Sequence, residues 1–154
     1  MSRRDQIKMS DEEVDAFLRD GRLSMGVATV RPTGRVDLVA MWYGFFPDGA
    51  LGFWTYGKSQ KVLNLRRDPR LTVLVESGDA YDQLRGVEIA GQGVVSDSAD
   101  DVMTIGLSVF ERYTGPPDDA ARGAVAAMGA KRVAVRIDAE SVVSWDHRKL
   151  GGRY

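Results

Sequence analysis

Short apolar stretches separated by turn residues recur along most of the chain and predict a β-rich protein. Each stretch is rich in β-branched or aromatic residues and is bounded by Gly, Pro, Asp or Ser, which is typical of strands. About six strands are predicted, over residues 23–30, 36–46, 51–56, 71–76, 86–96 and 131–145. The turns at residues 32–34 and 47–49 favour an antiparallel meander of the first three strands.

Helices are predicted where apolar residues recur at helical spacing behind a capping residue. Ser10 and Glu13 form a capping box, and Val14, Phe17 and Leu18 share one face behind it. Further helices are expected over residues 59–67, 98–113 and about 118–128. This pattern predicts a mainly β fold with flanking helices, an antiparallel closed or split β-barrel, in a single domain over residues 1–154.

The composition is that of an ordinary globular protein and excludes several kinds of chemistry. A net charge of −1 argues against a general nucleic-acid binder, and the lack of cysteine excludes disulfides and thiolate chemistry. His147 is the one histidine, so a histidine metal site or a Ser-His-Asp triad is not expected. The polar residues 1–10, and the lack of an apolar run of about 20 residues, predict a cytoplasmic protein without signal peptide or membrane span.

The most informative segment is residues 54–61 (WTYGKSQK), which leads from a predicted strand through a turn into a predicted helix. The N-terminus of a helix offers unpaired amides and a positive dipole end, which suit a phosphate. Thr55 and Ser59 add hydroxyl donors, and Lys58 and Lys61 add positive charge. From these residues alone, a phosphate site and an ordinary N-cap flanked by surface lysines are equally good interpretations.

Four short motifs follow one another along the middle of the chain. They are Val39-Ala40-Met41-Trp42, Phe53-Trp54-Thr55, Ser59-Gln60-Lys61 and Asp68-Pro69-Arg70. Their order and spacing resemble the pyridoxamine 5′-phosphate oxidase-like flavin-binding split barrels, over residues 11–146. The resemblance implies that Ser59 and Lys61 grip a cofactor phosphate and that the strand at residues 39–42 lays its backbone along the flavin ring. It also implies that Trp54 and Thr55 border that ring.

Two further segments resemble the actinobacterial branch of this family that uses the deazaflavin coenzyme F420. They are residues 85–91 (RGVEIAG) and the start of the basic tail, residues 145–150 (WDHRKL). The resemblance implies an F420-dependent oxidoreductase that transfers a hydride between the reduced deazaflavin and a small unsaturated or quinone-like acceptor. An FMN-dependent oxidase or reductase of the same fold, and a non-catalytic cofactor carrier, remain open as alternatives.

The resemblance also predicts which residues bind the cofactor, while no catalytic residue and no metal ligand is nominated. The predicted residues are Val39, Ala40, Met41, Trp42, Trp54, Thr55, Lys58, Ser59, Gln60, Lys61, Arg85, Trp145, Arg148 and Lys149. Among the strand aromatics, Trp42 and Trp54 are expected to face the pocket, with the Phe residues mostly in the core.

Binding of coenzyme F420 requires a cationic path, because this cofactor carries a phosphodiester and an oligoglutamate tail. Candidates near the predicted helix are Lys58, Lys61, Arg66 and Arg67, and those in the tail are Arg148, Lys149 and Arg153. The family resemblance further implies a homodimer with the active site at the subunit interface. The expected partner is a small-molecule substrate, with no nucleic acid and no membrane.

Overall fold

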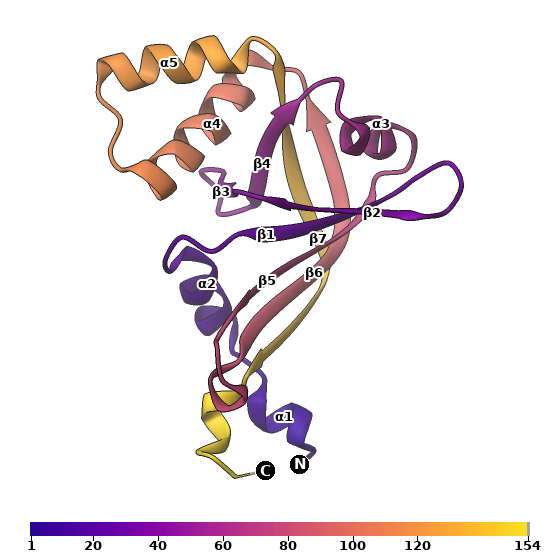
Figure 1. Ribbon diagram of the computed structural model, residues 1–154, viewed down its shortest axis with the longest axis vertical. Helices are drawn as coiled ribbons and strands as arrows, with labels where there is room; N and C mark the ends of the chain where they lie inside the picture. The colour runs from indigo at the N-terminus through magenta and orange to yellow at the C-terminus, as the bar shows by residue number, and fades with distance from the viewer. Residues whose placement is uncertain (154) are drawn as a thin grey trace.

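One antiparallel sheet of seven strands forms the body of the protein, whose computed structural model describes residues 1–153 (Figure 1). The strands are β1 (Met25–Val30), β2 (Val36–Met41), β3 (Gly44–Phe45), β4 (Leu51–Tyr56), β5 (Arg70–Ser77), β6 (Arg85–Ser96) and β7 (Arg132–Asp146). Their order is β2-β1-β5-β6-β7-β4-β3, and all neighbours are antiparallel. The sheet therefore matches the antiparallel architecture that the sequence predicts.

The chain passes from edge strand β2 to the opposite edge strand β3 through Trp42 and Tyr43 alone. The sheet is therefore curled so far that its two edges come close. The prediction of one strand over residues 36–46 is wrong, and Tyr43 explains why. Its side chain is fully buried, its hydroxyl donates to the Leu18 carbonyl at 2.7 Å, and its amide donates to the Tyr113 hydroxyl at 3.3 Å. The result is a split β-barrel, which confirms the predicted fold.

The helices lie outside the sheet. Within residues 1–153 they are α1 (Arg3–Ile7), α2 (Asp11–Arg19), α3 (Gln60–Arg67), α4 (Ala99–Thr114) and α5 (Asp119–Gly129), with 3₁₀ turns η1 (Tyr81–Gln83) and η2 (His147–Leu150). Figure 1 shows α4 and α5 together at one end of the molecule, and α1 beside both chain ends at the other. None of the helices described is long and apolar enough to cross a membrane.

Two apolar clusters hold these elements together. The larger cluster fills the barrel, where alternate strand residues such as Val27, Val73 and Phe53 point inward. The smaller cluster lies between α4 and the sheet and includes Phe46 and Ile105. Phe46 and Phe53 are therefore core residues, as predicted for most Phe side chains.

Candidate functional site

The segment from β4 to α3 forms a turn that presents the N-terminus of a helix. The amide of Gly57 donates to the Lys131 carbonyl at 3.0 Å, and the amide of Ser59 donates to the Tyr56 carbonyl at 3.0 Å. Ser59 is the N-cap residue of α3, but its side chain makes no capping hydrogen bond. Its hydroxyl oxygen is buried and has no partner in the described part of the chain. A buried hydroxyl without a partner is costly, so its presence needs an explanation.

Lys61 brings a cation to the same place. Its Nζ donates to the Thr55 hydroxyl at 3.0 Å, and Thr55 itself is buried at the end of β4. Burial lowers the pKa of the Lys61 amine, and no carboxylate of residues 1–153 forms an ion pair with it. We call Thr55, Ser59 and Lys61 the anion cradle, because its hydroxyls, amine and helix N-terminus favour a bound anion.

A buried hydrogen-bond network fixes α3 against the sheet below the anion cradle. The fully buried Asn64 accepts from Gln60 Nε2 at 2.9 Å and donates to Thr29 at 3.0 Å and to Asp37 at 2.8 Å. Burial acts to raise the pKa of Asp37, but hydrogen bonds from Asn64 and Arg31 outweigh it and keep this pKa below the usual value. The network positions the cradle rigidly. Sequence reasoning missed Asn64, for which the spacing of four residues from Gln60 was the available signal.

Strand β2 lies beside this region at one edge of the sheet. Within the described sheet, Val39, Ala40 and Met41 pair with β1 alone, so every second residue of β2 directs its N–H and C=O groups away from the sheet. Trp42 follows and stacks on Tyr113, with ring centroids 4.4 Å apart, although 55% of Trp42 is exposed. The edge of β2 and the Trp42 ring thus offer hydrogen-bonding groups and an aromatic face to a planar ligand. Tyr113 was not singled out in the sequence.

The side chains of Trp54 and Thr55 point to opposite faces of β4. Successive strand residues point to opposite faces, and Trp54 packs under the helices, against Gly106 of α4 and Gly129 of α5. The guanidinium of Arg132 lies 4.7 Å from its ring. Trp54, which was expected to face the pocket, therefore lies on the other side of β4 from the anion cradle.

The remaining predicted residues lie at the far end of the long strands. Strand β7 passes the anion cradle at Val133, which pairs with Thr55, and reaches Asp146 thirteen residues later, about 40 Å along an extended strand. Trp145 lies flat across Gly86 there. Arg85, Arg148 and Lys149 belong to the same end, so within one chain they are not brought to the cradle.

Several predicted cations are already engaged within the protein. Arg148 pairs with Asp146 at 2.7 Å, and Lys149 pairs with Glu13 at 2.6 Å. Near the cradle, Arg66 pairs with Asp97 at 3.0 Å, and Arg67 donates to the carbonyl of Val30. Lys58 is exposed on the turn beside the cradle. No group of three or more acidic or histidine side chains in residues 1–153 could hold a metal ion.

The curled antiparallel sheet with flanking helices is the architecture of the split-barrel proteins related to pyridoxamine 5′-phosphate oxidase. The chain belongs to the pyridoxamine 5′-phosphate oxidase family, whose model matches residues 10–146. This family binds flavin-type cofactors. Among curated proteins, none matches the sequence.

Solved structures extend this comparison. A conserved hypothetical protein, Rv2991 of Mycobacterium tuberculosis, is 44% identical with a TM-score of 0.93, and the match covers 100% of this chain and 95% of that one. An F420 reductase is 25% identical with a TM-score of 0.63, covering 82% of this chain and 93% of that one. A putative 5-nitroimidazole antibiotic resistance protein of Bacteroides thetaiotaomicron shares the fold at 12% identity, with a TM-score of 0.73, covering 90% and 84% of the two chains.

Proposed function

We propose that this chain is an F420-dependent oxidoreductase whose substrate is a small unsaturated or quinone-like acceptor. The observation that carries the proposal is the anion cradle, where the Ser59 hydroxyl has no partner and Lys61 has no counter-ion among residues 1–153. A phosphate held there would accept hydrogen bonds from both groups and receive the positive end of the α3 dipole. The similarity to an F420 reductase supports a deazaflavin as the group that carries this phosphate.

The edge of β2 is the part of the site that suits the cofactor ring. Alternate residues of the segment from Val39 to Met41 offer unpaired N–H and C=O groups to the polar rim of a planar ring, and Trp42 offers an aromatic face. When bound, the reduced deazaflavin would supply a hydride to an electron-poor carbon of the acceptor. The chain's own residues would hold the cofactor and orient the acceptor beside Trp42.

A cationic hollow next to the cradle suits the acidic tail of coenzyme F420. This cavity of about 630 Å³ lies at the turn between β1 and β2 and includes Arg31, Arg35 and Gln60. Arg31 pairs with Asp37 at 2.6 Å, whereas the Arg35 guanidinium has no ion pair within residues 1–153. Because Gln60 directly precedes Lys61, an oligoglutamate leaving the cradle would meet these arginines first. The sequence had suggested a cationic path along Lys58, Lys61, Arg66 and Arg67 or along the basic tail, and did not single out Arg31 or Arg35.

A homodimer belongs to this proposal, and the outer face of the sheet supports it. Leu38 is 74% exposed, and its cross-strand neighbours on the same face are the small residues Ala28 and Thr72. Leu74 of β5 adds a further exposed apolar side chain. Exposed apolar side chains next to the edge of β2 favour association with a second copy, which would complete the site.

An FMN-dependent oxidase or reductase is the second candidate, because the anion cradle would accept the phosphate of FMN equally well. The experiment that separates the candidates measures the dissociation constants of coenzyme F420 and FMN. It also follows the oxidation of reduced F420 by menadione and by cyclohexenone. We expect F420 to bind more tightly than FMN and at least one acceptor to be reduced.

Two results would overturn this proposal in different ways. Tight binding of FMN without binding of F420 would establish the FMN alternative. Tight binding of F420 without turnover, over a panel of quinones and enones, would instead indicate a non-catalytic cofactor carrier.

A further inference from the structure

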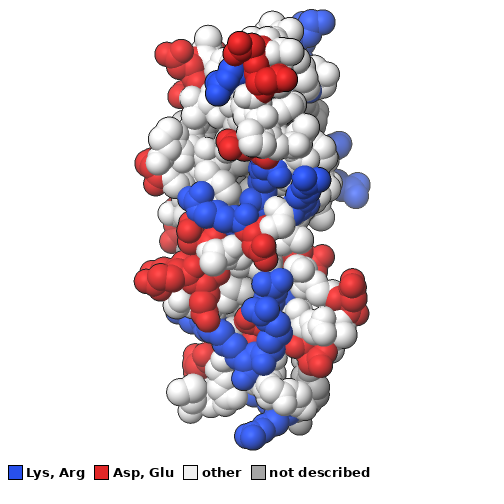
Figure 2. Space-filling view, turned by 90° about the vertical axis from the view of Figure 1, so that its left-hand side faces the viewer, with Lys and Arg blue, Asp and Glu red and all other residues white. Residues whose placement is uncertain are grey.

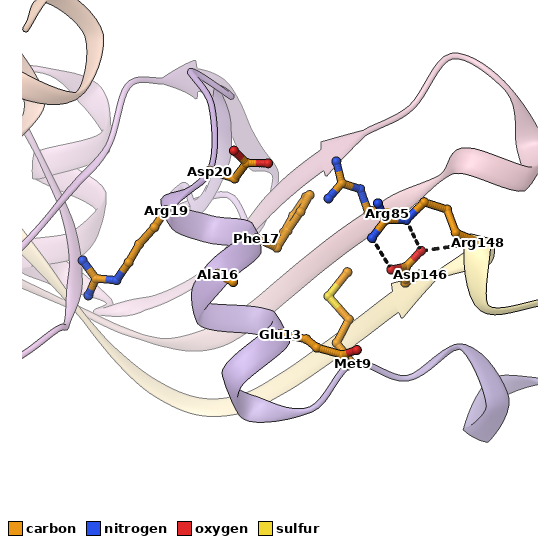
Figure 3. Close-up of a pocket in the computed structure, with 9 residues that line it drawn as sticks. All are labelled: Met9, Glu13, Ala16, Phe17, Arg19, Asp20, Arg85, Asp146 and Arg148. Atoms are coloured by element: carbon orange, nitrogen blue, oxygen red, sulfur yellow. Dashed lines mark hydrogen bonds and ion pairs between the residues drawn. The ribbon is translucent and has the colours of Figure 1, made fainter.

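A cavity of about 510 Å³ lies under α2, between that helix, the start of β6 and the end of β7 (Figure 3). Met9 and Phe17, both almost fully buried, give it an apolar wall, and Ala16 extends that wall along α2. A cavity of this size with an apolar wall and a few polar groups has the character of a small-molecule site. We call it the α2 cavity.

Most charged groups around the α2 cavity are already neutralised within the chain. The buried carboxylate of Asp146 accepts hydrogen bonds from the Arg148 amide, Nε and Nη2 at 3.0, 2.9 and 2.7 Å. Glu13 accepts from Lys149 Nζ at 2.6 Å. Arg19 points away from the cavity (Figure 3). These side chains therefore leave little unsatisfied charge for a ligand.

Arg85 is different, because its guanidinium lines the cavity without a hydrogen bond or ion pair to any side chain in the described chain. It is held over the ring of Phe17, with its central carbon 5.1 Å from the ring centroid. Stacking orients the guanidinium but uses none of its five N–H donors. Its planar fork matches the two oxygens of a carboxylate.

Asp20 provides the opposite charge at the other side of the Phe17 ring (Figure 3). Its backbone carbonyl accepts a hydrogen bond from Arg112, but its carboxylate has no partner among residues 1–153. An anionic group in the cavity is therefore attracted to the Arg85 end and repelled from the Asp20 end. The carboxylate of Asp146 repels such an anionic group only weakly, because Arg148 neutralises it.

We propose that the α2 cavity is a second ligand site, which binds a small organic carboxylate with an aromatic or aliphatic body. The carboxylate lies on the guanidinium of Arg85, and the apolar body lies against Phe17 and Met9. This site is distinct from the anion cradle of the same chain, because the length of β7 separates the two. The proposal does not depend on which cofactor the cradle holds.

The test uses phenylpropionate and its neutral isostere, phenylpropanamide, as probes of the full chain in calorimetric titrations. We expect phenylpropionate to bind at least about tenfold more tightly than the amide, which is the change that a charge-assisted hydrogen bond predicts. Arg85→Gln should lower the affinity for phenylpropionate to that for the amide. Arg66→Gln, which removes an arginine paired with Asp97 elsewhere on the surface, should leave both affinities unchanged.

Three results would overturn the proposal. One is equal binding of the acid and the amide, and another is no binding of the acid up to about 10 mM. The third is Arg85→Gln leaving acid binding unchanged while weakening cofactor binding, which would assign Arg85 to the cofactor site of a partner subunit. A far-ultraviolet circular dichroism spectrum and a thermal melt of Arg85→Gln establish that the variant is folded.

Discussion

At the residue scale, the N-cap residues of the helices differ in whether their side chains make a capping hydrogen bond. The side chains of Ser2, Ser10, Ser98 and Asp118 all accept a hydrogen bond from an amide of the helix they cap. Ser59 occupies the same position before α3, yet its buried hydroxyl makes no such bond. Its stabilising effect on the free protein is therefore small, and we infer that its hydroxyl is retained for an anion.

Replacing Ser59 by alanine separates these two roles. We expect Ser59→Ala to leave the free energy of unfolding unchanged or to raise it by about 1 kcal/mol, because no hydrogen bond is lost and a buried, unpaired hydroxyl is removed. The same change should raise the dissociation constant of the phosphate-bearing cofactor about tenfold. Urea unfolding and equilibrium titration measure the two quantities.

Ser10→Ala is the matched control for this experiment, since Ser10 forms a complete capping box with Glu13. It should cost about 1 kcal/mol of stability and leave cofactor binding unchanged. If Ser59→Ala instead destabilises the protein as much as Ser10→Ala and binds cofactor normally, Ser59 is an ordinary cap.

The residue types in the cradle were predictable from the sequence, but the availability of each cation was not. Lys61 and Arg148 read alike as basic candidates near a cofactor. Among residues 1–153, the Lys61 amine hydrogen-bonds only to the Thr55 hydroxyl, whereas Arg148 forms a bidentate pair with the buried Asp146. Whether a cation is free depends on which side chain lies opposite it in space, and the charge pattern of the sequence does not contain that information. Figure 2 shows basic and acidic groups interleaved on the face that carries α2.

At the element scale, the break between β2 and β3 is what splits the barrel. Tyr43 sits at this break, where its hydroxyl bonds Leu18 and receives a hydrogen bond from Arg112 at 2.7 Å. The Arg112 guanidinium also covers the Tyr43 ring, with its central carbon 4.2 Å from the centroid, and donates to the carbonyls of Arg19 and Asp20 at the end of α2. One buried tyrosine therefore ties the barrel edges to α2 and α4.

The ionisation of Tyr43 makes this link dependent on pH. Burial raises the pKa of Tyr43 from 10.0 to about 12, although the nearby Arg112 acts to lower it. The folded state thus favours the neutral phenol. The corresponding stability is fully present below pH 10 and is lost as the pH rises toward about 12. We expect the free energy of unfolding, measured in urea, to fall over this range in the wild-type protein.

Tyr43→Phe should remove most of this alkaline loss. It should also cost about 1–2 kcal/mol at neutral pH, because the Leu18 carbonyl loses its buried donor. Tyr56→Phe is the control, because the Tyr56 side chain is 57% exposed. The free energy of unfolding of this variant should follow the wild-type pH profile. An alkaline loss of the same size in Tyr43→Phe would refute the role given to this phenol.

The elements that the sequence predicted best are those whose boundaries depend on neighbours along the chain. The capping box at Ser10 and the strand over residues 51–56 agree with the structure. The break at Tyr43 depends on Leu18 and Tyr113, which are 25 and 70 residues away in sequence. An apolar, aromatic run with strand propensity throughout gives no local sign of contacts at such separations.

At the scale of the whole molecule, the proposed homodimer assigns the outer face of the curled sheet to the contact between two copies. Substituting the exposed Leu38 by arginine places a charge in the middle of the face that we assign to a second copy. We expect sedimentation velocity to show a dimer for the wild-type chain and a monomer for Leu38→Arg, because burying an unpaired charge is costly.

Met128→Arg tests whether loss of the dimer is specific to substitutions on the outer face of the sheet. Met128 is similarly apolar and 48% exposed, but it lies on α5 at the end of the molecule. Its substitution should leave the dimer intact. A monomeric wild-type protein, or a Leu38→Arg variant that stays dimeric, would remove the outer sheet face from the proposed interface.

The most direct measurement compares each cofactor with its counterpart that lacks the phosphate, in the wild-type chain and in Lys61→Ala. The pairs are FMN with riboflavin, and coenzyme F420 with its deazaflavin chromophore without the phosphodiester. The anion cradle predicts that the phosphate of the preferred cofactor strengthens binding about tenfold or more, and that Lys61→Ala removes this difference while Lys8→Ala keeps it. Equal affinities within each pair, or a phosphate effect that persists in Lys61→Ala, would contradict the assignment of the cradle.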